Sequence, residues 1–406
     1  MLVPTAIPAT VAIPGHYTVH NQVRLVRGGA PYFQQLLQMI AGARQSIHLQ
    51  TYIFLDDSTG QMVVEALAAA AARGVKVYLL LDSYGSEQRP QHWTDQLASR
   101  GIQFRWFSPL VQTSRYSFGR RMHHKVVVAD AQEALVGGVN ISDRYNDLPD
   151  QPAWLDWAVH CEGQVAAELY LVCQEMFSRQ VWGKRRRKRL LAAMARYAPD
   201  AYCPIRVRRN DWVRRQISIT RSYFEMFAGA REHITIMSAY FLPGRALRKA
   251  MKQAAAGGVG IRIIAAGKSD VGIAKAAERY LYSWLLRCGV QLYEYQPQVL
   301  HAKLSCADDE WVTVGSYNVN NLSAYVSIEL NLDIADRPFA QQVAAQLHTI
   351  VAEYCQPVTL AEWEANRNWW QRLKERMAYD LLRLSFVFFY FFVRKSRAVS
   401  SARLQR

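Results

Sequence analysis

Two groups of polar residues, far apart in the chain, repeat the same residue types at the same spacing. Each group has a histidine, then a lysine after 2 residues, an aspartate after 7, a glycine after 14 and an asparagine after 17. The residues are His123, Lys125, Asp130, Gly137 and Asn140 in the first group, and His301, Lys303, Asp308, Gly315 and Asn318 in the second. Five matched positions indicate one chemical site built twice rather than two unrelated surface turns.

The chemistry of these residue types suits attack on a phosphodiester. A neutral imidazole can attack phosphorus, and a charged one can protonate the departing alkoxide. The resulting phosphohistidine can then be attacked by an incoming hydroxyl. The two lysines and the amides of Asn140 and Asn318 would neutralise and orient the non-bridging oxygens. Because the carboxylates show no clustering of the kind that a metal-assisted route uses, we expect neither a metal ion nor another cofactor.

Apolar runs after each histidine predict the strands that position these groups. Residues 126–129 and 304–307 each read as a strand that turns at the motif aspartate. A histidine and a lysine two apart on a strand share one face, so His124 is expected to point to the other face. For His48 and His233, in matching earlier strands, a core role and a direct role are both open.

Helices and strands alternate through the first half, and the same order restarts at about residue 221. This alternation predicts a largely parallel sheet sandwiched between helices in each half. Six scattered cysteines, with no C-x-x-C pair, indicate free thiols in a reducing compartment rather than a zinc site or disulfides. The Pro-rich first fifteen residues lack the basic start of a signal peptide, so we expect an extended N-terminus.

The charge of the chain indicates a polyanionic partner, either nucleic acid or an anionic membrane. The net charge is +16 and the isoelectric point about 9.7. The basic run 184–189 could dock on lipid headgroups or be a solvated linker. The apolar segment 384–393 covers about 15 Å as a helix, too short to span a bilayer. It is predicted to lie in the membrane interface, with Trp369 and Trp370 at headgroup level; packing on a domain or a dimer interface is the alternative.

The doubled motif resembles the signature of the phospholipase D superfamily, H-x-K-x4-D followed by G-(G/S)-x-N, over residues 20–355. Within it the chain is most similar to bacterial cardiolipin synthases without N-terminal transmembrane helices. The narrower resemblance rests on Arg120-Arg121-Met122, on Gly137-Gly138-Val139-Asn140 and on the segment 75–85.

The resemblance implies an α/β fold with two homologous phospholipase D-like α/β/α sandwich domains, related by a pseudo-two-fold axis, around one cleft. The expected parts are an extended N-terminus (1–20), a first domain (21–180), a basic linker (181–215), a second domain (216–358) and a membrane-associating segment (359–406).

The resemblance also implies a role for each site residue. His123 would carry the phosphatidyl group and His301 would act as acid and base. Asp130 and Asp308, counted with the catalytic residues, would brace the site rather than exchange protons. A carboxylate after each asparagine would orient the opposite histidine: Glu329, 28 residues after His301, and Asp156, 33 residues after His123.

The implied reaction moves a phosphatidyl group from phosphatidylglycerol to a second phosphatidylglycerol, giving cardiolipin and glycerol. The enzyme would sit peripherally on the cytoplasmic side of a bacterial inner membrane, with anionic phospholipid and not nucleic acid as its partner. The alternatives are a phospholipase D hydrolase or a nuclease that uses the same histidines, and a non-catalytic membrane scaffold. The apolar segment 384–393 argues against the nuclease.

Overall fold

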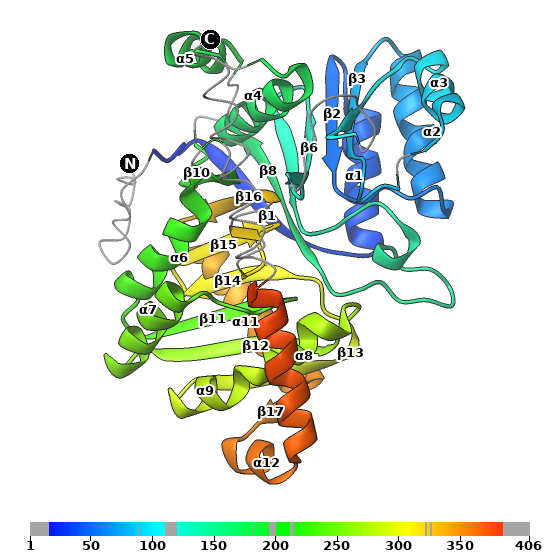
Figure 1. Ribbon diagram of the computed structural model, residues 1–406. Coiled ribbons are helices and arrows are strands. Elements are labelled where there is room, and N and C mark those ends of the chain that lie inside the picture. The colour runs from blue at the N-terminus through cyan, green and yellow to red at the C-terminus, as the bar shows by residue number, and fades with distance from the viewer. Residues whose placement is uncertain are drawn as a thin grey trace, which may run out of the picture.

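The computed structural model describes residues 16–87, 89–109, 120–180, 182–194, 200–211, 214, 216–320, 323–324 and 327–384. Within these ranges the chain forms two β-sheets with helices packed on both faces (Figure 1). Each sheet is built from one half, except that the short strand β5 (Arg121–Met122) of the first half pairs with the second sheet. The α/β class and the two similar halves are as predicted.

The first sheet has seven strands in the order β1, β8, β7, β6, β2, β3, β4. Their bounds are β1 (Asn21–Arg27), β2 (Ser46–Thr51), β3 (Lys76–Asp82), β4 (Ile102–Phe107), β6 (Lys125–Ala129), β7 (Glu133–Gly137) and β8 (Trp157–Gly163). Alternate residues of β6 face opposite sides, so Val127 packs with one set of helices and Val128 with another. The first set is α1 (Ala30–Gly42), α2 (Ser58–Ala72) and α3 (Gln91–Ser99); the second includes α4 (Gln164–Ser178).

The second sheet follows the same plan and is longer. Its order is β10, β9, β16, β15, β14, β11, β12, β13, β17. The strands are β9 (Ile205–Asp211), β10 (Gln216–Ile217), β11 (His233–Ser238), β12 (Gly260–Lys268), β13 (Gln291–Val299), β14 (Lys303–Ala307), β15 (Trp311–Gly315), β16 (Ser327–Ile334) and β17 (Cys355–Val358). The helices are α6 (Ser218–Gly229), α7 (Arg245–Ala256), α8 (Gly272–Tyr280), α9 (Tyr282–Arg287), α11 (Arg337–Tyr354) and α12 (Leu360–Ala365).

The prediction of largely parallel sheets was wrong. Strands β2, β3 and β4 are parallel, but β6, β7, β8 and β1 are antiparallel to their neighbours, and the second half repeats this division. The short turn at each motif aspartate makes β6 and β7, and β14 and β15, antiparallel, since a connection of a few residues can only join antiparallel strands. The parallel strands are joined by helical crossovers, α2 and α3 in the first half and α7, α8 and α9 in the second.

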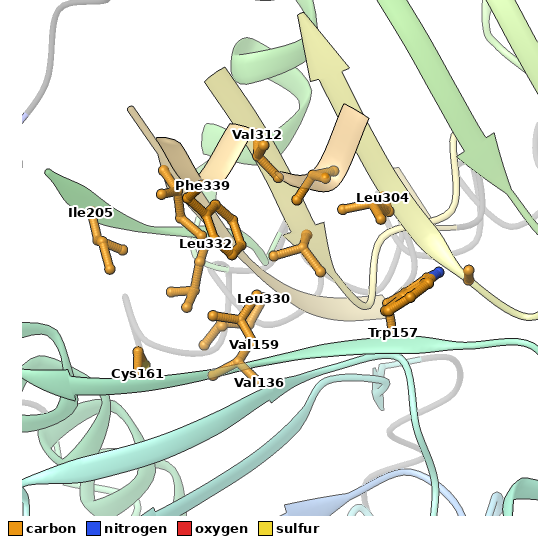
Figure 2. Close-up of a cluster of buried hydrophobic side chains, with 14 of the residues drawn as sticks. Val136, Trp157, Val159, Cys161, Ile205, Leu304, Val312, Leu330, Leu332 and Phe339 are labelled. Carbon is orange, nitrogen blue, oxygen red and sulfur yellow. The ribbon is translucent and has the colours of Figure 1, made fainter. Parts of the chain in front are cut away.

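The two halves share one hydrophobic core. Side chains of β6, β7, β8 and α4 pack in a single cluster with side chains of β14, β15, β16 and α11. Figure 2 shows Val136, Val159 and Cys161 of the first sheet beside Leu330 and Leu332 of the second. Each fully buried aliphatic side chain of this kind contributes about 1.5–3 kcal/mol relative to exposure. Separating the halves would expose many of them, so this core holds the two halves in a fixed relative position.

Part of the segment expected as a basic linker belongs to the second sheet, because residues 205–210 of β9 pair with β16. The basic run forms helix α5 (Lys184–Met194). There Arg187 pairs with Glu168 at 3.5 Å and with Glu175 at 3.3 Å on α4. Four other basic residues of α5 are exposed: Arg185, Arg186, Lys188 and Arg189.

The C-terminal part of the described chain is a helix over residues 369–384. No helix among the described residues combines the length and apolarity needed to cross a membrane. The apolar residues 385–393 and the N-terminal residues 1–15, for which predictions were made above, lie outside the described residues.

Candidate active site

Backbone contacts between the halves bring the two motif histidines to their junction. The N–H groups of His123 and His124 donate to the carbonyl of Ile328 at 2.9 and 3.1 Å, and that of His301 donates to Leu155 at 2.8 Å. Each half thereby holds the histidine of the other. Strands β6 and β14 begin at the lysine, one residue before the predicted runs 126–129 and 304–307.

A buried carboxylate from the opposite half contacts each imidazole. Nδ1 of His123 lies 3.1 Å from Oε2 of Glu329, and Nδ1 of His301 lies 2.6 Å from Oδ2 of Asp156. Both carboxylates are fully buried. An acid at this position fixes the ring and holds the proton on Nδ1, which leaves Nε2 as the reactive nitrogen.

The two motif lysines lie beside the histidines and are almost fully buried. Nζ of Lys125 donates to the carbonyl of His123 at 2.6 Å, and Nζ of Lys303 donates to the carbonyl of His301. Lys303 also lies 2.9 Å from Nδ1 of His301. An ammonium group cannot accept a hydrogen bond, so Nδ1–H of His301 donates its hydrogen bond to Asp156 and not to Lys303. The remaining lysine protons are available to an anion.

Burial sets the protonation states of this cluster. It lowers the pKa of Lys125 to about 7 and that of Lys303 to about 8. Burial raises the pKa of Asp156 to about 6, although Lys303 opposes the rise. Burial also lowers the pKa of His123 and holds that of His301 well below its ordinary value, where both lysines add to the effect. Without a bound anion, burial thus favours the neutral form of both imidazoles and weakens the charge of both lysines.

The motif asparagines are buried with unused hydrogen-bonding capacity. Oδ1 of Asn140 accepts from the N–H of Ile53 at 3.1 Å. Its Nδ2, and Oδ1 of Asn318, make no hydrogen bond within the described part of the chain. Buried polar groups in this state suit a polar ligand, which would complete their bonding.

Gly138 and Ser316 occupy equivalent positions in the two halves. Gly138 packs against the carboxylate of Asp156, and Ser316 lies next to that of Glu329. A Cβ atom at Gly138 would lie 2.4 Å from Oδ1 of Asp156, so only glycine leaves that carboxylate its space. The hydroxyl of Ser316 instead donates to Oε2 of Glu329 at 2.5 Å. The G-(G/S)-x-N segment therefore supports the carboxylate as well as carrying the asparagine.

The motif aspartates do not lie among the histidines. Asp130 is at the far end of β6, about 16 Å from Lys125 by strand rise. Its carboxylate accepts the N–H groups of Arg44, Gln45 and Ser46 at 2.7–2.8 Å. Asp308 accepts those of residues 231–233 at 2.8–2.9 Å. Both aspartates hold the backbone at the ends of the strands, in agreement with the predicted bracing role. Their place among the catalytic residues stays a prediction.

Three other histidines lie away from the cluster. His124 points to the other face, where its Nε2 is 2.9 Å from Oε1 of Gln50. His48 is fully buried and stacks on Tyr78 at 4.5 Å between ring centroids. His233 is a surface residue whose Nε2 is 2.9 Å from Asp309. Among the described residues, none of these three side chains is hydrogen-bonded to the imidazole of His123 or His301.

Aromatic residues that the sequence did not single out surround the histidines. Tyr52 lies 4.8 Å from His123 between ring centroids, and Tyr145 and Trp154 lie 5.1 and 6.1 Å from His301. No aromatic residue stands at the equivalent positions of the other half, so the repeat in the sequence could not point to these three residues. Among the described residues no group of three or more His, Cys, Asp or Glu side chains could hold a metal ion. The six cysteines are free, as predicted.

Comparison with known proteins gives the family. The family model "Cardiolipin synthase, PLD-like domain" matches residues 36–155 and 223–351. Cardiolipin synthase B of Salmonella typhi is 36% identical over 365 residues, which are 89% of this chain and 88% of the relative. Cardiolipin synthase B of Escherichia coli K12 is 34% identical over the same shares. Cardiolipin synthase A of Pseudomonas aeruginosa LESB58 is 31% identical over 82% of this chain and 68% of its own.

A solved structure supports the fold. The phosphatidylserine synthase of Haemophilus influenzae Rd KW20 superposes with a TM-score of 0.68 over 90% of this chain and 93% of its own, at 14% identity. Together with the doubled motif, these matches show that the chain belongs to the cardiolipin synthase family of phosphatidyltransferases within the phospholipase D superfamily.

Proposed function

We propose that the enzyme makes cardiolipin from two molecules of phosphatidylglycerol through a phosphohistidine on His123. The observation that carries this proposal is the pair of buried imidazoles, each held through Nδ1 by a carboxylate of the other half. Two nitrogens poised in this way can divide nucleophilic attack and proton transfer between them.

The first step forms the intermediate. Nε2 of His123 attacks the phosphorus of phosphatidylglycerol and the bond from phosphorus to the glycerol oxygen breaks. His301, in the protonated form that the bound phosphate anion favours, gives its proton to that oxygen. In the second step a hydroxyl of another phosphatidylglycerol loses its proton to His301 and attacks phosphorus. The nitrogen–phosphorus bond breaks, which frees His123 and releases cardiolipin.

The neighbouring residues stabilise the charge that develops on the phosphoryl oxygens. Lys125 and Lys303 place two ammonium groups at this point, where low polarity strengthens their effect. The unpaired Nδ2 of Asn140 is suited to donate to the same oxygens. Asn318 would donate to them through its own Nδ2, because its unpaired Oδ1 is an acceptor. An anionic phosphate would in turn favour the charged forms of both lysines.

The test uses purified protein with liposomes of phosphatidylglycerol in the presence of chelator, and the products are resolved by mass. Cardiolipin with free glycerol is the expected result. Phosphatidic acid alone would make the enzyme a hydrolase. Cleavage of a control oligonucleotide without any lipid product would make it a nuclease.

We also propose that the helix over residues 369–384 binds the surface of an anionic membrane, on the cytoplasmic side, where free cysteines persist. Its solvent side carries an apolar stripe with spacings of three and four: Trp370, Leu373, Met377, Leu381 and Leu384, which are 39–61% exposed. Basic residues alternate with the stripe: Arg372, Lys374, Arg376 and Arg383. The opposite side rests on the domain, with Tyr379 4.8 Å from Tyr280 between ring centroids.

Vesicle flotation tests this membrane contact. Charges on the stripe, in the double variant Met377→Glu with Leu381→Glu, should reduce binding to phosphatidylglycerol vesicles by about tenfold or more. Ile217→Glu, which changes an apolar residue that is 45% exposed elsewhere, is the matched control. Unchanged flotation of the double variant would remove the helix as the docking element.

A further inference from the structure

The two histidines have different neighbours on the strand beside them. In the second half Ser238 pairs with Lys303, and the N–H of Ala239 donates to the carbonyl of Ala302 at 3.1 Å. The next residue in this register, Tyr240, therefore comes opposite His301. In the first half Gln50 pairs with Val126, and the same count places Ile53 opposite His123.

Tyr240 is joined to an acid. Its hydroxyl donates to Oδ1 of Asp270, which lies in the loop between β12 and α8. Tyr240 is half-buried and Asp270 is exposed, so a molecule in solution can reach both. Burial raises the pKa of Tyr240 far above its usual range, and Asp270 adds to the rise, so the phenol keeps its proton.

Asp270 is also close to the catalytic cluster. Burial lowers the pKa of His301 and of Lys303, and the negative charge of Asp270 offsets part of the change at both. Tyr145 and Trp154, which flank the His301 ring, complete this side of the site. The carboxylate of Asp270 and the phenol of Tyr240 thus lie on the side of the site where Tyr145 and Trp154 flank His301.

The side of His123 is built differently. Ile53 offers no hydroxyl, and the ring nearest the imidazole is Tyr52. Arg121 lies there over the ring of Tyr84, at 5.1 Å. The acid of this region, Asp82, is fully buried and already accepts the N–H groups of Met122, Tyr84 and Gly85, so it has little capacity for a ligand.

The reaction proposed above explains why the surroundings of His301 and His123 differ, and the inference below rests on that proposed function. When His123 attacks phosphorus in line, the alcohol departs on the opposite side, toward His301, and the new alcohol enters there. We propose that Tyr240 and Asp270 form a subsite for the alcohol, which binds a vicinal diol such as the glycerol headgroup. The reacting hydroxyl faces His301, and the neighbouring hydroxyl donates to the Asp270 carboxylate.

The surroundings favour a neutral diol over a cationic headgroup. An ammonium beside Asp270 would also approach Lys303 and the guanidinium of Arg144, which lies 5.3 Å over the ring of Trp154. A hydroxyl donates to the same carboxylate without that repulsion. A site built to bond a hydroxyl discriminates against the alcohol that lacks it, because its polar groups are then left unpaired.

The experiment compares two acceptors of equal carbon number, 1,2-propanediol and 1-propanol, mixed at equal concentration with phosphatidylglycerol vesicles. The ratio of the two phosphatidyl-alcohol products, measured by mass, is independent of total turnover. For the wild type the diol product should exceed the propanol product by about tenfold. In Asp270→Ala and in Tyr240→Phe the ratio should fall toward one. Asp309→Ala, which removes an acid from a surface pair with His233, should keep the wild-type ratio.

Two results would overturn the subsite: a wild-type ratio near one, or variants that lose total turnover at an unchanged ratio. The second result is what a merely structural role predicts. Failure of the proposed function looks different, because the wild type would then transfer the phosphatidyl group to neither alcohol.

Discussion

The two halves build the same histidine–carboxylate pair from different parts. His123 pairs with a glutamate whose Oε2 also accepts from Ser316, whereas His301 pairs with an aspartate packed against Gly138. Aspartate is one methylene shorter, so its carboxylate stays near the backbone, in the space that a serine side chain would take. The length of the acid therefore depends on the residue that packs against it: a glutamate goes with Ser316 and an aspartate with Gly138.

In both halves the histidine pairs with a carboxylate of the opposite half. Each carboxylate, and each carbonyl that holds a histidine backbone, belongs to the half that lacks that histidine. A complete imidazole–carboxylate pair therefore exists only across the shared core. Differences between the pairs can be tested by matched changes in both halves.

Removal of either imidazole should have the largest effect. His123→Ala and His301→Ala should each lower turnover by about 10³-fold or more, since one removes the nucleophile and the other the acid and base. The halves should differ in the trapped species: only a variant that retains His123 can form a phosphoenzyme. Mass spectrometry of the intact protein after brief exposure to substrate makes the distinction. A phosphoenzyme in His123→Ala would reverse the roles.

Neutral replacements of the carboxylates should come next. Asp156→Asn and Glu329→Gln keep the shape but weaken the hold on the Nδ1 proton, so kcat should fall by about 10²–10⁴-fold. Circular dichroism and the melting temperature serve as controls for folding. Retention of full kcat in either variant would mean that its histidine is positioned by the backbone alone.

Much of this comparison could be predicted from the sequence, because the repeat fixes residue types at fixed spacing. The strands after His123 and His301 and the crossed acids Asp156 and Glu329 all lie where they were expected. The distance of Asp130 from the histidine also follows from strand rise, since five steps of about 3.3 Å separate it from Lys125. The predicted bracing role of Asp130 agrees with this position.

Other features depend on tertiary register and could not be found in the sequence. Tyr145 and Trp154 reach His301 only because Leu155 bridges to Leu300 between the halves. The antiparallel part of each sheet depends on a turn in which Asp130 and Ala131 adopt left-handed backbone, φ 53° and 57°. Neither residue type demands that conformation, although aspartate tolerates it.

Exchange of the supporting residues tests the coupling directly. Gly138→Ser places an atom against the Asp156 carboxylate and should lower kcat by about tenfold or more. Ser316→Gly removes one hydrogen bond to Glu329 and should cost about threefold to tenfold. The double variant Gly138→Ser with Asp156→Glu copies the other half and should recover part of the loss. No recovery would mean that the two positions are independent.

The pH dependence of kcat/KM should separate the two pairs further. Asp156 has a raised pKa of about 6, so it is ionised only above that pH, and activity should fall about tenfold per unit below it. Above about pH 7–8 the lysines lose charge and activity should fall again. Asp156→Asn should remove the acid limb of the profile, whereas Glu329→Gln should retain it. An acid limb that persists in Asp156→Asn would assign it to another group.

The motif aspartates should show the smallest effect on activity and the same effect in both halves. Asp130 and Asp308 each accept three backbone N–H groups at the start of a strand, and neither contacts the histidines. Asp130→Ala and Asp308→Ala should each lower the free energy of unfolding by about 2 kcal/mol, because charged acceptors are lost. Activity per folded molecule should stay near wild type at low temperature. Equal shifts in melting temperature with preserved kcat would show that Asp130 and Asp308 play the same role in the two halves. Asp156 and Glu329, by contrast, differ between the halves.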